Sequence, residues 1–391
     1  MCAVEWKKLG DVCYFQNGFA FKSNKFKEEG LGIVRITNIK DSVLDLSSLI
    51  YFERSDYPNQ DLKQFEIHKG DILIAMSGAT TGKIGCFLSD ETLYLNQRVG
   101  KFIPCEELDN RYLYHLLKKD EEFFYQLAGG GAQPNLSSIK LMDSYCFYLP
   151  TLAKQQEIVS HLDTFTTLIT NLESELDMRR KQYEHYRNQL LDFEGKDSRY
   201  IVPFGDICKI VRGNGVQKAD FVEVGIGCIH YGQIYTHYGS YTYTTNRFVS
   251  QDVFDKAVKA SKGDIIMTDT SENVEDICKS VAYLGDEDIA VSNHSFIIKH
   301  NQNPKYLSFC TLTYSFGLQK KKVVFGAKVS SIKQDNLAKI NIYLPPIEEQ
   351  NQIVEKLDAF ENLIQSLEQE IKLRKQQYEY YREKLLTFEK E

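Results

Sequence analysis

The feature that most constrains this chain is an internal repeat with a period of 195 residues. Residues 149–194 align without a gap on residues 344–389, and 23 of the 46 positions are identical. The same offset pairs Gly10 with Gly205, although the segments between the well-matched stretches have diverged much further. A repeat of this length indicates one structural design used twice, so the chain is predicted to fold as two related halves.

The well-matched part of each repeat carries apolar residues in steps that alternate between four and three, which is a heptad pattern. In the first copy this apolar seam consists of Ile158, Leu162, Phe165, Ile169, Leu172 and Leu176. In the second copy it consists of Ile353, Leu357, Phe360, Ile364, Leu367 and Ile371. Two such seams in one chain predict that two long helices pair, and a two-fold relation between the halves makes the coiled coil antiparallel. The alternative is that each helix lies on its own globular domain.

Prolines mark where the helical segments are expected to begin. Pro150 precedes the first segment and Pro346 the second, and proline is tolerated at a helix start but not within a helix. The charged stretch Glu194–Arg199 lacks apolar residues and is expected to be an exposed linker. The predicted order is globular domain, helical segment, globular domain, helical segment, at residues 1–150, 151–197, 198–345 and 346–391.

Each globular segment combines several β-rich runs with fewer helical patterns. Ile33–Ile39 and Asp264–Thr268 are typical of strands. Residues 110–127 and residues 304–318 indicate helices. The expected fold class is therefore mixed α+β, with two globular domains separated by two long helices.

Composition restricts the class of protein. No run of 18 apolar residues occurs, and Met1–Asp11 lacks the apolar core of a signal peptide, so we expect a cytoplasmic protein without membrane contact. The nine cysteines include no C-x-x-C pair, so neither a metal site nor a disulfide framework is predicted. The net charge of −7 argues, taken alone, against nucleic-acid binding, but much of the acidity lies in the helical segments.

No motif for catalysis or nucleotide binding is present. The turn Ser77–Gly85 (SGATTGKIG) departs from a P-loop, because only three residues separate Gly78 from Gly82 and Ile84 replaces the magnesium-binding hydroxyl. This turn is either a surface loop that offers donors to a phosphate backbone or a plain hairpin turn. The sequence therefore favours a binding protein over an enzyme, with no cofactor of its own.

Three segments resemble the specificity subunits of type I restriction-modification enzymes. Leu149–Leu162 (LPTLAKQQEIVSHL) and Leu344–Leu357 (LPPIEEQNQIVEKL) are similar to the LPPL-x-E-Q-x-x-I boundary of that family. Lys69–Gly85 resembles the central motif of its target-recognition domains. The first copy departs from the boundary motif at Thr151 and Lys154, and the resemblance covers essentially the whole chain.

The resemblance implies a non-enzymatic subunit that recognises a sequence in double-stranded DNA. The two globular domains would be target-recognition domains, each reading one half of a bipartite target, and the paired helices would set the spacing between the halves. The helices would also dock two methyltransferase subunits, which carry S-adenosylmethionine, and restriction (nuclease-translocase) subunits could join. Such partners could supply the positive charge that this chain lacks.

Polar residues that differ between the copies within a retained framework are candidates for reading two different half-sites. Arg35 corresponds to His230 and Asn38 to Gln233, and major-groove geometry favours arginine on guanine and asparagine or glutamine on adenine. Ordinary drift of surface residues in an old duplication is the alternative. The candidate DNA-contacting residues are Arg35, Asn38, Thr80, Lys83, Gln97, Arg98, Gln133, Asn135, His230, Gln233, Thr268, His294 and Lys328.

Three further interpretations stay open on the sequence alone. The run Lys320–Lys322 is either a solvated face or a phosphate contact. A coiled-coil scaffold or adaptor with protein-binding globular ends would need the same paired helices. A methyltransferase hidden in the globular domains is disfavoured because its motifs are absent.

Overall fold

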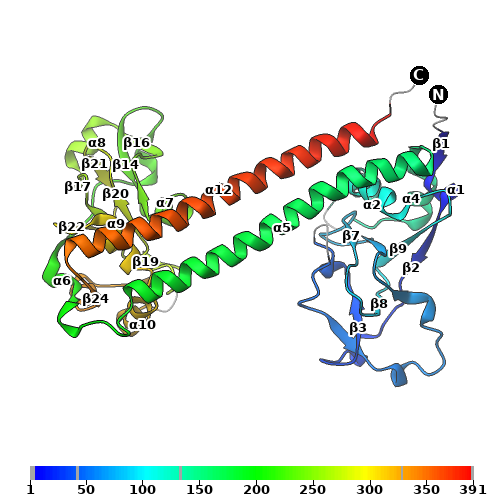
Figure 1. The fold of residues 1–391 in the computed structure, drawn as a ribbon, viewed down its shortest axis with the longest axis horizontal. Coiled ribbons are helices and arrows are strands. Elements are labelled where there is room, and N and C mark those ends of the chain that lie inside the picture. Colours follow the sequence, from blue (N-terminus) through cyan, green and yellow to red (C-terminus); the bar gives the residue numbers. More distant parts are fainter. Residues whose placement is uncertain (1–4, 41–43, 132–133, 327–328, 389–391) are drawn as a thin grey trace. The chain divides into compact units, whose positions relative to one another are not determined.

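A computed structural model of the chain describes residues 5–40, 44–131, 134–326 and 329–388. The chain divides into two compact units, and Figure 1 traces their elements. The first unit consists of Met1–Leu172 with Glu370–Glu391, and the second unit consists of Glu173–Gln369. Each unit therefore holds one globular domain together with part of both long helices.

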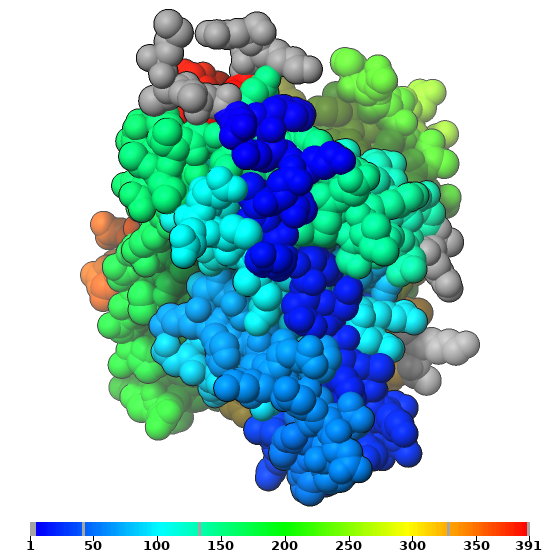
Figure 2. Space-filling view, turned by 90° about the vertical axis from the view of Figure 1, so that its right-hand side faces the viewer, coloured from blue at the N-terminus to red at the C-terminus, as the bar shows by residue number. Residues whose placement is uncertain are grey.

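The globular domain of the first unit is built on two four-stranded sheets. The antiparallel sheet has the order β2 (Cys13–Asn17), β9 (Val99–Pro104), β6 (Ile72–Ala75) and β7 (Ile84–Cys86). The mixed sheet has the order β4 (Ile50–Phe52), β3 (Leu31–Val34), β8 (Leu93–Leu95) and β5 (Glu66–Ile67). A separate ladder pairs β1 (Glu5–Lys8) with β10 (Cys146–Leu149), and the dark blue residues that include β1 lie on the surface in Figure 2.

Strand β6 shows how the sequence places two hydrophobic layers on either side of one sheet. Its four residues are all fully buried, and successive side chains of a strand point to opposite faces. Ile72 and Ile74 join the core cluster that also contains residues of the long helices. Leu73 and Ala75 join the cluster that contains β3 and β8 of the mixed sheet.

The second unit repeats this strand order with additions at the edges. Its first sheet has the order β12 (Cys208–Arg212), β22 (Ser295–His300), β18 (Ile265–Thr268), β20 (Ser280–Tyr283) and β15 (Tyr241–Thr242). Its second sheet has the order β13 (Phe221–Val222), β16 (Arg247–Val249), β14 (Ile226–Ile229), β21 (Ile289–Val291) and β17 (Lys259–Ala260). Two short ladders pair β11 (Ile201–Pro203) with β24 (Asn341–Tyr343) and β19 (Thr270–Ser271) with β23 (Ser330–Ser331).

Four adjacent strands of the first sheet correspond between the units, with β2, β9, β6 and β7 matching β12, β22, β18 and β20. Strands β15 and β13 have no counterpart among the described strands of the first unit. The duplication seen in the sequence is therefore a duplication of topology as well. The expected mixed α+β class is confirmed.

Short helices cover the sheets of both units. In the first unit they are α1 (Leu9–Val12), α2 (Asn110–Lys119), α3 (Glu121–Leu127) and α4 (Ser138–Ser144). In the second they are α6 (Phe204–Ile207), α7 (Tyr231–Thr236), α8 (Gln251–Lys256), α9 (Pro304–Cys310), α10 (Tyr314–Val323) and α11 (Gln334–Ala338).

Two helices that the sequence predicts as continuous are each broken in two. Residues 110–127 form α2 and α3, because the backbone at Asp120 leaves helical geometry and its carboxylate accepts a 2.6 Å hydrogen bond from the Tyr145 hydroxyl. Residues 304–318 form α9 and the start of α10, because Thr313 caps a new helix by accepting from the Phe316 N–H. Thr313 is therefore a capping residue, whereas the Asp120 side chain does not cap α3 and bonds to Tyr145 instead.

The long helices are α5 (Leu152–Leu191) and α12 (Ile347–Leu386). In the first unit Phe165 of α5 stacks on Tyr381 of α12, with ring centroids 5.4 Å apart. In the second unit the repeat-equivalent residues, Phe360 of α12 and Tyr186 of α5, also stack at 5.4 Å. Since the early part of each helix contacts the late part of the other, the helices pair in antiparallel orientation within each unit.

The structure buries or half-buries every residue of the two predicted seams. The seam residues at the start of each helix also enter the core of the adjacent globular domain. Ile158 and Leu162 join the core of the first domain, and Ile353 and Leu357 join that of the second. Both alternatives drawn from the sequence are thus realised, because each helix start lies on its own domain and also contacts the other helix.

A buried glutamine fixes the first turn of each long helix to its domain. The Gln155 Nε2 donates to the carbonyl oxygens of Pro150 at 2.8 Å and Glu107 at 2.9 Å, and its Oε1 accepts from the Asp109 N–H at 2.7 Å. The equivalent Gln350 donates to the Pro345 carbonyl at 2.8 Å. Both glutamines are fully buried, so each satisfies backbone groups that water does not reach.

None of the helices in the described residues is both long enough and apolar enough to span a membrane.

Replacing the clamping glutamine should destabilise the first unit. We expect Gln155→Ala to lower the free energy of unfolding by about 1–3 kcal/mol, because it leaves buried backbone groups unpaired. The measurement is urea unfolding followed by fluorescence of Trp6, the single tryptophan. The ring centroids of Trp6 and Tyr148 lie 4.6 Å apart in the ladder beside the helix start. The exposed neighbour Gln156 gives a matched control, and equal losses for Gln155→Ala and Gln156→Ala would contradict the clamp.

Candidate nucleic-acid interface

In the second unit, the C-terminal ends of β12 and β18 lie on either side of the N-terminal end of β22, at one edge of the first sheet. The Gly213 N–H, just after β12, donates to the Ser295 carbonyl at 2.8 Å, and the Asp269 N–H, just after β18, donates to the His294 carbonyl at 3.1 Å. These backbone bonds bring Arg212, Asp269 and His294 together, although they lie far apart in the sequence.

The three side chains interact directly at these strand ends. The Arg212 Nη2 lies 3.2 Å from Asp269 Oδ2, and the His294 Nδ1 lies 3.8 Å from Asp269 Oδ1. The Arg212 side chain is 66% exposed, whereas the Asp269 side chain is only 5% exposed. His294 has a φ of 63°, which is unusual for a residue other than glycine and turns the chain sharply into β22. The result is an exposed cationic and aromatic surface over a buried carboxylate.

The equivalent strand ends of the first unit carry different side chains. Asn17 ends β2 and donates to the Ser138 hydroxyl at 3.4 Å. Gln97 and Arg98 lie in the turn between β8 and β9, both exposed, and neither side chain is bonded to another described residue. Asn135 is exposed and pairs through its backbone with Ser77. Of the candidates in this half, Gln97, Arg98 and Asn135 therefore lie on an accessible surface at the strand ends.

The candidate pairs Arg35–Asn38 and His230–Gln233 have a structural use that the sequence comparison did not reveal. The Arg35 N–H donates to Asn38 Oδ1, and the His230 N–H donates to Gln233 Oε1, both at 2.9 Å. Each pair caps a short helical turn, so the strand expected at Ile33–Ile39 stops at Val34.

The oxygen and the nitrogen of both side-chain amides are engaged within the protein. The Asn38 Nδ2 donates to the Asp45 carbonyl at 2.9 Å, and the side chain is fully buried. The Gln233 Nε2 donates to Asn246 Oδ1. His230 is also buried, and burial lowers its pKa, which favours the neutral ring that accepts from the Gly232 N–H at 3.2 Å. These three side chains therefore stabilise the local structure of their own domains.

Two more candidates are used inside the first domain. The Thr80 hydroxyl donates to the Ile36 carbonyl at 3.0 Å, so it supports the turn at Ile36–Asn38. The Lys83 Nζ lies 3.1 Å from the Glu121 carboxylate, which also accepts from the Ile84 N–H at 2.8 Å. The glycine-rich turn is thus a hairpin connection in which Thr80 and Lys83 bind other parts of the domain.

In the second domain, two residues expected at a surface are instead buried. Thr268 is fully buried in β18, and its hydroxyl donates to backbone carbonyls. Lys320, the first residue of the basic run, donates to the carbonyls of Glu275 and Ile277, both at 2.8 Å, and burial lowers its pKa. Lys321 and Lys322 are exposed. The candidates Gln133 and Lys328 lie outside the described residues.

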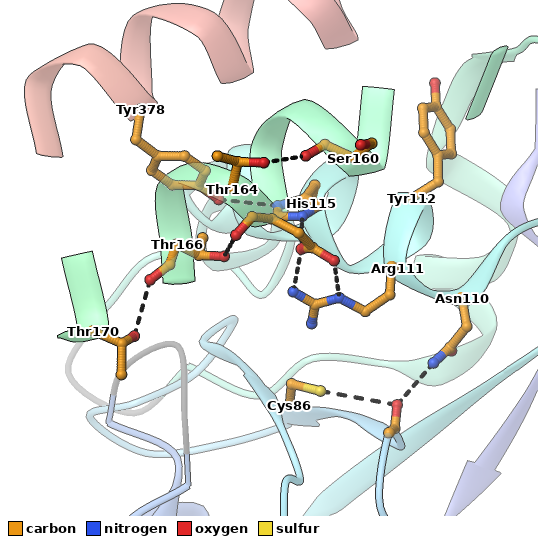
Figure 3. Close-up of polar contacts among 12 residues, drawn as sticks. Cys86, Asn110, Arg111, Tyr112, His115, Ser160, Thr164, Thr166, Thr170 and Tyr378 are labelled. Atoms are coloured by element: carbon orange, nitrogen blue, oxygen red, sulfur yellow. Dashed lines mark hydrogen bonds and ion pairs between the residues drawn. The ribbon is translucent and has the colours of Figure 1, made fainter. Parts of the chain in front are cut away.

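A second polar cluster lies where the first domain meets both long helices (Figure 3). The Arg111 Nε donates to the Asp163 carboxylate at 3.2 Å, and His115 Nε2 lies 2.8 Å from Asp163 Oδ1. The other ring nitrogen of His115 lies 3.0 Å from the Tyr378 hydroxyl on α12. Through these contacts helix α2 is bonded to α5 and to α12 within the first unit.

The electrostatics of this cluster favour an ionised Asp163 and a neutral His115. Burial opposes ionisation of Asp163, but hydrogen bonds from His115 and Arg111 outweigh it and lower the pKa of Asp163 to about 2. Burial lowers the pKa of His115 against the opposing effect of Asp163. In the second unit the equivalent ion pair joins Lys305 to Asp358 at 2.7 Å.

Among the residues that the structure describes, no three His, Cys, Asp or Glu side chains are grouped so that they could hold a metal ion.

Comparison with known proteins places both halves in one group. A family model for the type I restriction modification DNA specificity domain matches residues 3–178 and again residues 196–373. A putative type I restriction enzyme specificity subunit of Haemophilus influenzae is 27% identical, over 98% of this chain and 96% of that protein. The specificity subunit of a type I restriction enzyme of Escherichia coli is 30% identical, over 61% of each.

Solved structures share the fold at low sequence identity. The S subunit of a type I restriction-modification system from M. genitalium matches with a TM-score of 0.57 and 14% identity, covering 100% of this chain and 97% of that one. A chain from a study of complex assembly and conformational transition in the type I R-M system matches with a TM-score of 0.59 and 16% identity, covering 98% and 97%.

Breaking the ion pair on α5 should destabilise the first unit. We expect Asp163→Asn to cost about 1–3 kcal/mol, less than for a fully buried pair because both side chains are about one-third exposed. Since the pKa of Asp163 is lowered by folding, its contribution is complete above about pH 4 and is lost toward pH 2. The difference between the variant and the original chain in Trp6-monitored unfolding should therefore shrink in acid.

The control for this change is Glu157→Gln on the same helix, because Glu157 forms only an exposed pair with Lys154. It should change stability by less than about 0.5 kcal/mol. An Asp163→Asn effect no larger than that of Glu157→Gln would show that the cluster does not stabilise the junction.

Proposed function

Because the chain belongs to the type I restriction modification DNA specificity family and carries two copies of its domain, we propose that each globular domain reads one half of a bipartite DNA target. The chain is a specificity subunit with two target-recognition domains, which we assign to residues 1–150 and 198–345. The proposal rests on one observation. The two units share a strand order, but equivalent strand ends carry different side chains.

The contrast between the two surfaces supports two different half-sites. The first unit presents Asn17, Gln97 and Arg98 where the second presents Arg212 and His294. In the major groove, asparagine and glutamine favour adenine, whereas arginine favours guanine. A retained scaffold with different side chains at its strand ends is therefore suited to reading two different half-site sequences. In this proposal the chain itself performs no catalysis.

The long helices are proposed to dock two methyltransferase subunits, one on each unit. In support, exposed apolar residues outside the seam recur at equivalent positions. The first unit presents Leu168 of α5 and Leu373 of α12, and the second presents the equivalent Leu363 of α12 and Met178 of α5. Exposed apolar side chains at repeated positions favour two copies of the same partner. Restriction subunits would join through the methyltransferases or beside them.

Exchange of one domain tests the modular reading. Replacing residues 1–150 with the corresponding domain of another family member should change one half of the methylated sequence and leave the other half unchanged. The measurement is methylome sequencing of cells that express the chain with its methyltransferase subunit. A change in both halves would contradict independent reading, and methylation without any bipartite sequence would favour a scaffold function.

Charges placed on the proposed docking residues should remove partners one at a time. Leu168→Asp and Leu363→Asp are each expected to reduce the number of bound methyltransferase subunits from two to one, and the double variant to reduce it to none. Native mass spectrometry of the co-expressed complex measures the stoichiometry. Asn362→Asp adds the same charge at an exposed neighbour and should leave two subunits bound. Full occupancy in the double variant would place docking elsewhere.

A further inference from the structure

The Arg212–Asp269 pair combines an exposed guanidinium with a buried carboxylate. Asp269 is 3% exposed, yet it is held in place from several sides. Its Oδ1 accepts from the Thr270 hydroxyl at 2.8 Å, and its carbonyl accepts from the Ile332 N–H at 3.0 Å. Only Oδ2 is directed to Arg212, at 3.2 Å from Nη2. A fixed acceptor of this kind orients a side chain that would otherwise be mobile at the surface.

The orientation leaves most of the arginine donors available to a ligand. A guanidinium has five N–H groups, and the shortest contact with Asp269 is made by one nitrogen, Nη2. The backbone of Arg212 is fixed as well, because Arg212 pairs with Phe296 in the ladder of β12 and β22. An arginine with a fixed base and free donors is preorganised, so little side-chain entropy is lost when it binds.

A buried carboxylate under a surface arginine is costly if it serves stability alone. Exposed ion pairs contribute little, and removing a carboxylate from water carries a large desolvation cost. At the strand ends of the first unit, Asn17 occupies the Arg212 position and Met76 the Asp269 position, so the fold forms without this pair. The Arg212–Asp269 pair is therefore specific to the second domain. This is expected if Arg212 reads one of two different half-sites.

Among base edges, guanine best matches such an arginine. Its O6 and N7 are adjacent acceptors in the major groove, and arginine binds them with two parallel hydrogen bonds. On the basis of the proposed function, we propose that Arg212, held by Asp269, reads a guanine in the half-site of the second domain. Asp269 acts as a positioning residue, since it lies beneath the guanidinium and does not reach the surface.

The experiment uses the full chain co-expressed with its methyltransferase subunit and a plasmid library in which every position of the methylated sequence is varied. Arg212→Lys keeps the positive charge but removes the planar fork. We expect the preference for guanine at one position of one half-site to fall about 5- to 150-fold, with the other positions unchanged. Asp269→Asn should weaken the same preference, because the arginine loses its negatively charged partner.

Arg199→Lys is the matched control. Arg199 also pairs with an aspartate, Asp197, at 2.6 Å, but it lies in the connection after α5, away from the strand ends. This variant should keep every base preference. Assembly with the methyltransferase subunit and thermal melting confirm that each variant is folded.

The outcomes separate this inference from the function on which it rests. If the original complex methylates no bipartite sequence, the proposed function fails. If it methylates one but Arg212→Lys keeps every base preference, or the second half-site contains no guanine, only the assignment of Arg212 fails. Uniform loss of methylation at all library sites by a folded, assembled Arg212→Lys complex would also overturn it, because that result points to a phosphate contact.

Discussion

The structure depends on the way each long helix is held by two sets of contacts at once. At its start, the apolar seam enters the core of the adjacent domain, where Ile158 and Leu162 or their equivalents Ile353 and Leu357 are buried. In the same unit the end of the other helix packs against it through stacked aromatic rings. A helix of this length would be marginal alone, so tertiary packing supplies its stability.

The framework of the repeat is conserved in its chemistry even where residues differ. Gln155 and Gln350 clamp the two helix starts in the same way, and an ion pair joins each domain to its long helix through Asp163 or Asp358. The aromatic–polar contacts around them have diverged, since His115 meets Tyr378 whereas Tyr183 donates to Glu361. Buried polar groups must be paired, but different partners satisfy that requirement.

At the strand ends, by contrast, the side chains differ between the two units. Asn17, Arg98, Arg212 and His294 are exposed there, so such residues change without cost to the core, and the two units present different donors and acceptors on the same scaffold. This separation of a fixed framework from variable tips agrees with a family whose domain confers DNA specificity. It also explains how an acidic chain can bind DNA, because recognition needs local donors at the strand ends rather than a basic surface throughout.

The sequence by itself determined the duplication, the paired helices and the mixed fold class, because a gapless match and a heptad period are local properties of the chain. It also predicted Gln97, Arg98 and His294, which are exposed at the strand ends, and Asn38 and Gln233, whose side-chain amides bond within their own domains. A comparison of the two copies does not show that each of the latter two side chains accepts a hydrogen bond from the backbone N–H three residues earlier. Only the tertiary structure decided which polar residues form a surface. Arg212, Asp269 and His294 are distant in sequence, and it is the register of three strands that brings them together.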